Sequence, residues 1–337
     1  MTTTNLEMSI YVLDQILDDP RFEGLIFSES AKSVLGRQSA YDDWEYDNCS
    51  SQDWSVPRLE RTWKPQPVEG SVRPFNDYPC LELIIPAFSA RAVEALRHFL
   101  EPNGEILPLS HSKGTYYAYQ ILTKADIINV KDSFIEWFSD DAARENVALD
   151  ITRYEFKKAK LKGHSIFRLK ENQSEVMVTE AFKQRVEECG LNGFQFTKVW
   201  PLPPGVYWRD AQIQARRAKV KKLGLQGEAL ILRFRSANNE ADAKEKRLIK
   251  SYEQQLNQLL VTQASLDAPY YGAIEAVEFS DDDCRIYLTC PKVEPLLELL
   301  HDWIHACKWP GEFHIVKRFG NLYDTKAKET REEVKRG

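Results

Sequence analysis

The sequence has few of the features that mark secreted, membrane-spanning and metal-binding proteins. Its 337 residues include only six cysteines and no Cys-x-x-Cys pair, which excludes a disulfide framework or a zinc ribbon and predicts reduced, mostly buried thiols. No apolar run approaches the roughly eighteen residues of a membrane span. The N-terminus shows neither the basic nor the apolar region of a secretory signal. We therefore expect a cytoplasmic protein with no membrane partner.

Motifs for common chemistry are also missing. The sequence contains no phosphate-binding loop, no dinucleotide-binding glycine pattern and no nucleophile elbow, so it predicts neither an enzyme nor a cofactor. The best metal candidate is the pair His301 and His305, because histidines four residues apart share one helical face. Asp302 stands where a zincin has its general-base glutamate, and no further ligand is evident. We therefore expect two flanking histidines and no metal site.

Charge is unevenly distributed along a chain of net charge −6. Residues 1–205 carry 23 basic and 31 acidic side chains, whereas residues 206–337 carry 22 and 20. An acidic balance argues against a dedicated nucleic-acid binder, whose footprint is normally basic. The acidic half is the better candidate for binding a basic protein.

The clearest boundary is the segment Trp200-Pro-Leu-Pro-Pro-Gly205, because three prolines and a glycine interrupt any helix or central strand. It predicts an N-terminal domain over 1–205 and a basic linker helix over 206–227. A second domain over 228–320 and a charged tail over 321–337 complete the chain. The linker's basic residues are typical of a solvated helix, with a patch that binds nucleic acid or an anionic surface as the alternative.

Hydrophobic periodicity orders the C-terminal domain clearly. It predicts strands at 228–235, 273–279, 284–290 and 313–319 and helices at 240–263 and 292–307. In the third strand Cys284 and Cys290 share the core face. The order strand, helix, strand, strand, helix, strand (βαββαβ) is that of the ferredoxin-like fold, with two helices on one face of an antiparallel sheet.

The N-terminal half predicts a mixed α/β domain with long loops, so the fold class is α+β overall. Residues 36–76 lack sustained periodicity and predict loops. Ser89 and Thr179 are expected to cap helices through Leu100 and Cys189, with Gly190 ending the second. Strands are expected at 10–13, 80–85, 105–109, 115–122, 149–156, 165–169 and 193–200.

Several of these segments together resemble a known family. They are Pro86-Ala-Phe-Ser89 leading into residues 91–96, the run 100–109, Tyr116-Tyr-Ala-Tyr119, and residues 178–187, 190–193 and 194–200. They are similar to the bacterial polymorphic-toxin immunity proteins of the family numbered eleven, over about residues 86–200. The resemblance implies a non-enzymatic protein that binds and neutralises a cognate toxin, which we expect to be encoded by a neighbouring gene. It assigns no catalytic or toxin-contacting residue.

Partner-binding candidates come from clusters of acidic and aromatic residues. A predicted loop, residues 41–47 and extending to 53–54, offers rigid aromatic side chains surrounded by negative charge, which suits a basic partner. Packing of Trp44 and Trp54 back onto the domain is the alternative. A second acidic cluster, 281–283, lies at a predicted hairpin turn and suffices as a turn signal. The candidates are Asp42, Asp43, Trp44, Glu45, Tyr46, Asp47, Asp53, Trp54, Asp281, Asp282 and Asp283.

An RNA-binding adaptor is the alternative function, because RNA-recognition modules share the ferredoxin-like order. Arg233, Arg235, Arg285 and Tyr287 could lie on its open sheet face. Against this, strand 284–290 lacks the aromatic-rich signature of those modules. Immunity by stoichiometric toxin binding is therefore the leading hypothesis.

Overall fold

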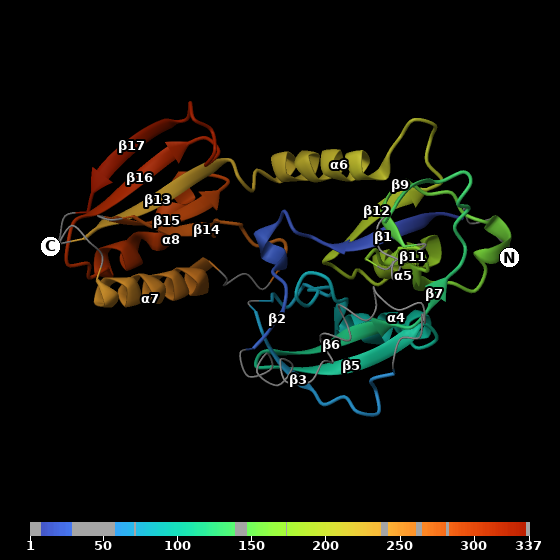
Figure 1. Cartoon of the computed structure of the whole chain (residues 1–337). Helices are drawn as coiled ribbons and strands as arrows, with labels where there is room; N and C mark the ends of the chain where they lie inside the picture. Colours follow the sequence, from blue (N-terminus) through green and yellow to red (C-terminus); the bar gives the residue numbers. More distant parts are fainter. Residues whose placement is uncertain are drawn as a thin grey trace. The chain divides into compact units, whose positions relative to one another are not determined.

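The computed structural model describes residues 8–28, 58–70, 72–138, 147–172, 174–236, 242–260, 265–280 and 283–334. It shows a mixed α/β protein with several sheets and, in these ranges, five α-helices (Figure 1). The chain divides into two compact units. Unit 1 comprises Met1–Leu17 and Arg21–Gln214, and unit 2 comprises Asp18–Pro20 and Ala215–Gly337. The division falls inside a helix, α6 (Trp208–Leu223).

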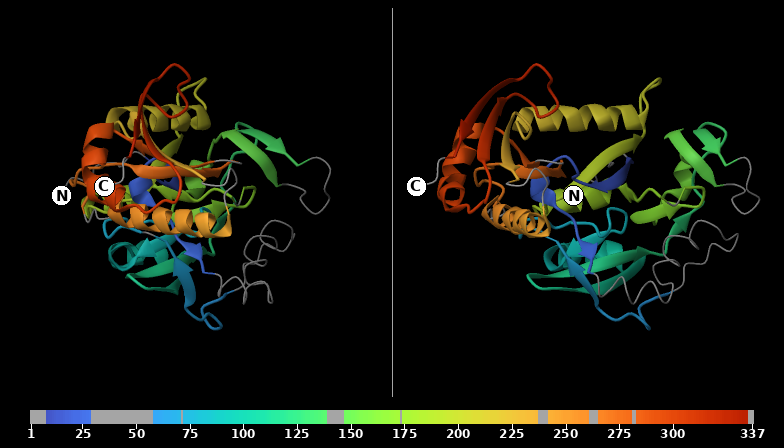
Figure 2. Two further views of the ribbon diagram at one scale, coloured as in Figure 1. Left: turned by 90° about the vertical axis from the view of Figure 1, so that its left-hand side faces the viewer. Right: turned by 60° about the vertical axis from the view of Figure 1, so that its left-hand side comes forward.

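Unit 1 is built from two five-stranded sheets and a two-stranded one. The first sheet has the order β12-β1-β11-β10-β7, the second has the order β2-β3-β5-β6-β4, and β8 pairs with β9. The second sheet is drawn in blue to teal in Figure 2. The elements are β1 (Ile10–Gln15), β2 (Ile26–Phe27), β3 (Gln66–Glu69), β4 (Ala87–Ser89), α4 (Ala90–Leu100), β5 (Gly104–His111), β6 (Gly114–Ile121), β7 (Lys124–Ala125), β8 (Phe134–Trp137), β9 (Ala148–Arg153), β10 (Ile166–Leu169), β11 (Met177–Thr179), α5 (Glu180–Glu188) and β12 (Phe194–Trp200). Single turns of 3-10 helix lie at Pro20–Phe22 and Lys158–Lys160.

Three apolar clusters hold these sheets together. The first joins one face of each five-stranded sheet to the buried stripes of α4 and α5, with Leu96 and Phe182 fully buried. The second covers the opposite face of the first sheet with residues of β8, β9 and Trp208. The third fills the opposite face of the second sheet. β1 is buried along nearly its whole length and reads as an apolar run, whereas β5 keeps an alternation of buried and more exposed residues.

The predicted helix starts are confirmed, with one difference in how they are capped. The hydroxyl of Ser89 accepts a hydrogen bond from the backbone N–H of Ala92 at 3.1 Å, which satisfies one free donor of α4. Thr179 occupies the corresponding position of α5 but makes no capping bond with its side chain. Gly190 follows α5 with φ +59°, the left-handed conformation that glycine adopts at helix ends.

The expected strand at 80–85 is wrong: these residues form a tight turn. Leu81 and Ile85 exchange two backbone hydrogen bonds of 2.8 and 2.9 Å, and both side chains are buried. Between them Glu82 and Leu83 adopt φ values of +52° and +69°, and Cys80 also has a positive φ. A left-handed conformation costs a non-glycine residue about 1–2 kcal/mol, so sequence propensity gave no warning of the turn.

Unit 2 contains one antiparallel sheet of order β14-β15-β13-β16-β17. The side chains of both helices and of the strands' inward positions form a single core, so α7 and α8 cover the same face (Figure 1). The predicted core cysteines Cys284 and Cys290 are fully buried there. The elements are β13 (Glu228–Arg235), α7 (Ala243–Leu260), β14 (Ala273–Phe279), β15 (Asp283–Cys290), α8 (Val293–Ala306), β16 (Phe313–Phe319) and β17 (Lys328–Glu333).

The segment expected as a charged tail contributes the edge strand β17. It pairs along the whole of β16, and its charges find partners there: Lys317 with Glu332 at 3.0 Å, and Arg318 with Glu329. The loop between the two strands returns toward the opposite edge of the sheet, where the hydroxyl of Tyr323 donates to Glu275 of β14 at 3.0 Å. Alternating charge gave no apolar pattern from which this strand could be predicted.

Candidate functional site

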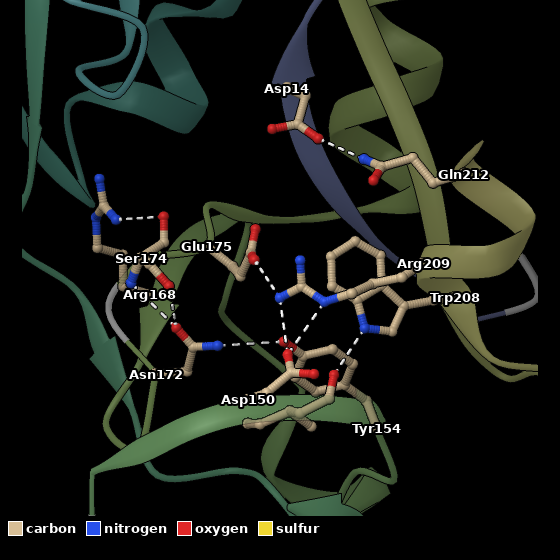
Figure 3. A network of polar contacts seen from close by, with 11 residues as sticks. Asp14, Asp150, Tyr154, Arg168, Asn172, Ser174, Glu175, Trp208, Arg209 and Gln212 are labelled. Carbon is tan, nitrogen blue, oxygen red and sulfur yellow. Dashed lines mark hydrogen bonds and ion pairs between the residues drawn. The ribbon is translucent and has the colours of Figure 1, made fainter. Parts of the chain in front are cut away.

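A network of polar contacts centred on Arg209 joins distant parts of unit 1 (Figure 3). Arg209 lies in the first turn of α6. Its guanidinium donates to Asp150 of β9 at 2.8 Å and to Glu175, just before β11, at 3.3 Å. The next turn of the helix adds Gln212, whose amide donates to Asp14 of β1 at 2.7 Å. Three segments far apart in sequence are thereby tied to the start of one helix.

Trp208 anchors the same turn. Its indole N–H donates to the carbonyl of Ile151 at 2.7 Å, and its side chain is 1% exposed. The ring packs 6.1 Å from that of Tyr154, while the Arg209 guanidinium lies 4.5 Å from the Trp208 ring centroid. A buried tryptophan with a satisfied N–H supplies both apolar area and orientation. The helix start is therefore fixed by packing, with the ion pairs on its exposed side.

Burial and neighbouring charges shift the pKa values of two residues in this network. Burial raises the pKa of Glu175, and the neighbouring Asp14 carboxylate raises it further, while Arg209 opposes both. Burial also raises the pKa of Tyr154 far above its ordinary value. The phenol therefore stays protonated at neutral pH and cannot act as a base. The hydrogen bonds of the drawn network hold β1, β9 and the residues before β11 to the start of α6.

A second buried node brings together segments that carry the family resemblance. Asp77 is 1% exposed and accepts hydrogen bonds from the Ser89 hydroxyl at 2.7 Å, from the backbone N–H of Asn192 at 2.9 Å and from the Arg91 guanidinium. Arg91 also reaches the carbonyl of Gly190 at 3.3 Å. The start of α4 and the turn after α5 therefore meet on one carboxylate. This contact gives the quoted segments a structural role.

The predicted acidic and aromatic cluster cannot be placed. Its members Asp42, Asp43, Trp44, Glu45, Tyr46, Asp47, Asp53 and Trp54 lie outside the described residues, as do Asp281 and Asp282. They stay predictions. The chain enters this stretch after Ser28, directly behind β2, and leaves it at Arg58, ahead of β3. β2 and β3 pair antiparallel, so both ends of the stretch belong to the same sheet of unit 1.

Asp283, the remaining member of the acidic set, is described, and its carboxylate is 1% exposed. It accepts from the Ser280 hydroxyl at 2.6 Å and pairs with Arg233 and with Arg285. Although burial acts in the opposite direction, the hydrogen bonds from these three residues lower the pKa of Asp283. This placement favours the turn-stabilising role over contact with a partner.

The arginines and the tyrosine of the RNA-binding alternative are held by carboxylates of the chain itself. Arg233 and Arg285 share one carboxylate oxygen of Asp283, Arg235 lies 3.4 Å from Glu312, and the Tyr287 hydroxyl donates to Glu278 at 2.8 Å. Guanidinium groups held by carboxylates are poorly placed to meet phosphate.

The histidine pair lies as the helical spacing indicates, with ring centroids of His301 and His305 4.6 Å apart on α8. His301 also contacts Asp302 at 3.0 Å. Across the described ranges no group of three His, Cys, Asp or Glu side chains is placed to hold a metal ion. The five cysteines in these ranges are free thiols. Burial raises the pKa of Cys80, Cys284 and Cys290 to about 12, which leaves these thiols unreactive.

Sequence reasoning missed both nodes. It assigned Arg209 to a solvated basic helix and attached no role to Asp77. Asp150 lies 59 residues before Arg209, and Asn192 lies 115 residues after Asp77. A single sequence does not indicate that side chains so far apart along the chain form a hydrogen bond or an ion pair.

Residues 107–200 match the model of the Immunity protein family (Imm11). The expected resemblance over 86–200 is thereby confirmed for a segment that runs from within β5 to the end of β12. No curated protein matches the chain. None of the helices described is long and apolar enough to cross a membrane.

Proposed function

We propose that this chain is a cytoplasmic immunity protein that neutralises a cognate bacterial toxin by binding it stoichiometrically. The match of residues 107–200 to an immunity protein family carries the proposal. The matched segment contains most of the first sheet and α5, and it supplies Asp150 and Glu175 to the Arg209 network. Unit 1 is therefore the unit to which we assign toxin binding.

Neutralisation in this proposal requires no turnover. The two polar nodes of unit 1 hold backbone segments in place, and their carboxylates are directed at arginines and backbone groups of the chain itself. Affinity would come from buried apolar contacts and speed of association from charge. Unit 1 carries 24 basic and 30 acidic residues, which favours a toxin with a basic surface.

The acidic and aromatic stretch over 41–54 remains our candidate for electrostatic steering. Replacing Asp42, Asp43, Glu45 and Asp47 with the corresponding amides should slow toxin association more than it speeds dissociation. Stopped-flow measurements at two salt concentrations would check this. Unchanged association kinetics would dismiss the stretch as the steering element.

For unit 2 we propose a ferredoxin-like domain extended by one edge strand. The order β14-β15-β13-β16, with both helices on one face, supports this assignment. We further propose domains over 1–205 and 228–320 joined by α6, with the first turn of α6 packed onto the first domain and β17 added to the sheet of the second. Limited proteolysis tests this division: the earliest cuts should fall in the part of the connecting segment after Gln214, up to residue 227, and early cuts inside β13–β16 would contradict it.

The direct test is co-expression of the tagged protein with the product of the neighbouring gene. The proposal predicts that the two proteins co-purify in a fixed ratio and that growth is rescued from the neighbour's toxicity. If the two proteins form no complex and growth is not rescued, the family match would indicate only a similar fold.

A further inference from the structure

The turn at residues 81–85 presents two large aliphatic side chains to solvent. Leu83 is 68% exposed and Ile84 is 50% exposed. The adjoining strand β2 adds Ile26, which is 48% exposed. Leu25 and Leu81 form a parallel bridge, so Ile26 lies beside the turn. We call Ile26, Leu83 and Ile84 the apolar knob.

The knob stands on a rigid base. The backbone N–H of Leu25 donates to Cys80 and the N–H of Glu82 donates to Leu25, both at 2.9 Å. The side chain of Glu82 turns back to accept from the N–H of Phe27 at 2.8 Å. Below the tip, Leu81 and Ile85 are anchored in the core of the second sheet. The backbone that carries the exposed side chains is therefore held in place by hydrogen bonds and core packing at its base.

This arrangement is unfavourable for the isolated chain. Leu83 occupies a left-handed conformation that leucine avoids, and its side chain gains little burial in return. Strain and exposed apolar surface at one place are typical of binding sites, where a partner supplies the missing burial. Pre-organised apolar side chains are also what interface hot spots require, because little entropy is lost on binding.

The charge around the knob restricts the partner. The knob residues lie in segments 23–28 and 80–85, and β3 (66–69) pairs with β2 beside them. Together these three segments contain three glutamates and no lysine or arginine. Glu69 is the cross-strand partner of Ile26, and Glu82 lies within the turn. An apolar centre bordered by carboxylates complements an apolar pocket with a basic rim.

We propose that the apolar knob inserts into a basic-rimmed pocket of the cognate toxin and is the main apolar contact of the complex. This inference rests on the proposed function and adds the surface through which it operates. The knob lies outside residues 107–200, so the family match does not assign it.

The test uses the full chain with the double substitution Leu83→Asn and Ile84→Thr. Asparagine tolerates a positive φ better than leucine does, so thermal stability should stay the same or rise. The affinity for the purified toxin, measured by titration calorimetry, should fall at least tenfold. Stability and binding would thus respond differently, which loss of folding cannot produce.

A matched control removes exposed aliphatic side chains elsewhere in unit 1. Leu149 is 53% exposed and Val130 is 44% exposed, and neither belongs to the second sheet. The variant Leu149→Asn with Val130→Thr should bind the toxin within twofold of the wild type. Equal losses in both double variants would mean that the knob has no special role.

Each outcome separates the two proposals. If the wild type does not bind the toxin, the proposed function fails. If the wild type binds and the knob variant binds equally well, immunity stands and the knob proposal is overturned. A clear fall in melting temperature of the knob variant would also overturn it, because the side chains would then be buried within the chain itself.

The charged border is tested separately with Glu69→Gln and Glu82→Gln. Glutamine keeps a side-chain oxygen for the N–H of Phe27, so the turn should be retained. Association with the toxin should slow several-fold at low salt, and the difference should shrink at high salt. Association rates that match the wild type at every salt concentration would contradict a basic rim.

Discussion

Both units pair buried carboxylates with arginines, but they differ in net charge and in one strained turn. In unit 2, which carries 21 basic and 21 acidic residues, the buried carboxylate Asp283 is surrounded by two arginines. Glu228 likewise binds Lys292 at 2.7 Å, together with the first N–H of α8. In unit 1, net charge remains in excess, and a strained turn holds leucine and isoleucine in solvent. Unit 1 therefore combines excess negative charge with exposed aliphatic side chains on a strained turn, which a partner can satisfy.

This difference indicates which unit contains the surface for binding a partner. A regular sheet with paired charges is complete by itself and follows local sequence rules. A unit with irregular backbone, exposed aliphatic side chains and excess negative charge departs from those rules at identifiable residues. The departures in unit 1 coincide with features that protein interfaces require.

The largest effect that would sharpen the comparison is expected from Trp208→Ala. The buried indole packs in unit 1, so its loss should lower the free energy of unfolding of that unit by about 3–5 kcal/mol. Hydrogen exchange should rise in β9 and β12 and stay unchanged in β13. The control Ile213→Ala, at a half-exposed position of the same helix, should change stability by less than about 0.5 kcal/mol. Loss of protection in both units would contradict separate stabilities.

A smaller effect is expected in unit 2 from Asp283→Ala. Removing this carboxylate leaves Arg233, Arg285 and Ser280 without their shared acceptor, which should cost about 2–4 kcal/mol. Urea denaturation followed by hydrogen exchange would locate the loss in β13 and β15. Asp302→Ala, at a fully exposed position, is the control and should be nearly neutral. A neutral Asp283 variant would mean that unit 2 does not depend on its internal pairing.

The smallest expected effect is a difference in how the stability of the two units depends on pH. The pKa of Asp283 lies below its ordinary 3.8 in the fold, so its contribution is present above that pH and is lost as the pH falls below it. The pKa of Glu175 lies above its ordinary 4.5, so ionisation destabilises the fold as the pH rises beyond that value. Between pH 3 and 7, Asp283→Asn should therefore become increasingly destabilising relative to wild type as the pH rises. Glu175→Gln should become increasingly favourable.

Melting temperatures of the two variants, each compared with wild type across that pH range, would check these slopes. Glu175 keeps an ion pair with an exposed Arg209, so we expect its slope to be the shallower one. Slopes of the same sign would contradict the contrast between Asp283, whose pKa is lowered by its hydrogen-bond partners, and Glu175, whose pKa is raised by burial.

Much of unit 2 was predictable because its strands alternate and its helices keep a 3.6-residue stripe. Cys284 and Ile286 point into the core, as period two requires. β17 escaped prediction because its residues, Lys-Glu-Thr-Arg-Glu-Glu, are stabilised by pairing with β16 rather than by burial. Backbone pairing at an edge leaves no hydrophobic signature.

In unit 1 the helix start at Ser89 and the glycine after α5 were predictable from local chemistry. The turn at Leu81–Ile85 was not, because an apolar run normally indicates a buried strand. Hydrogen bonds to Leu25 and Phe27, together with core packing of Leu81 and Ile85, hold it in a left-handed conformation. The Asp77 and Arg209 nodes depend on contacts between distant segments, which composition and periodicity do not record.

The most direct test of the central claim is a titration of the toxin's activity with the purified full-length protein. Stoichiometric immunity predicts that activity falls linearly and reaches zero at one fixed molar ratio, with the toxin recovered intact in a complex. The knob variant should need a clear excess to reach the same endpoint. Complete loss of toxin activity at far below one equivalent would indicate turnover and would contradict the account.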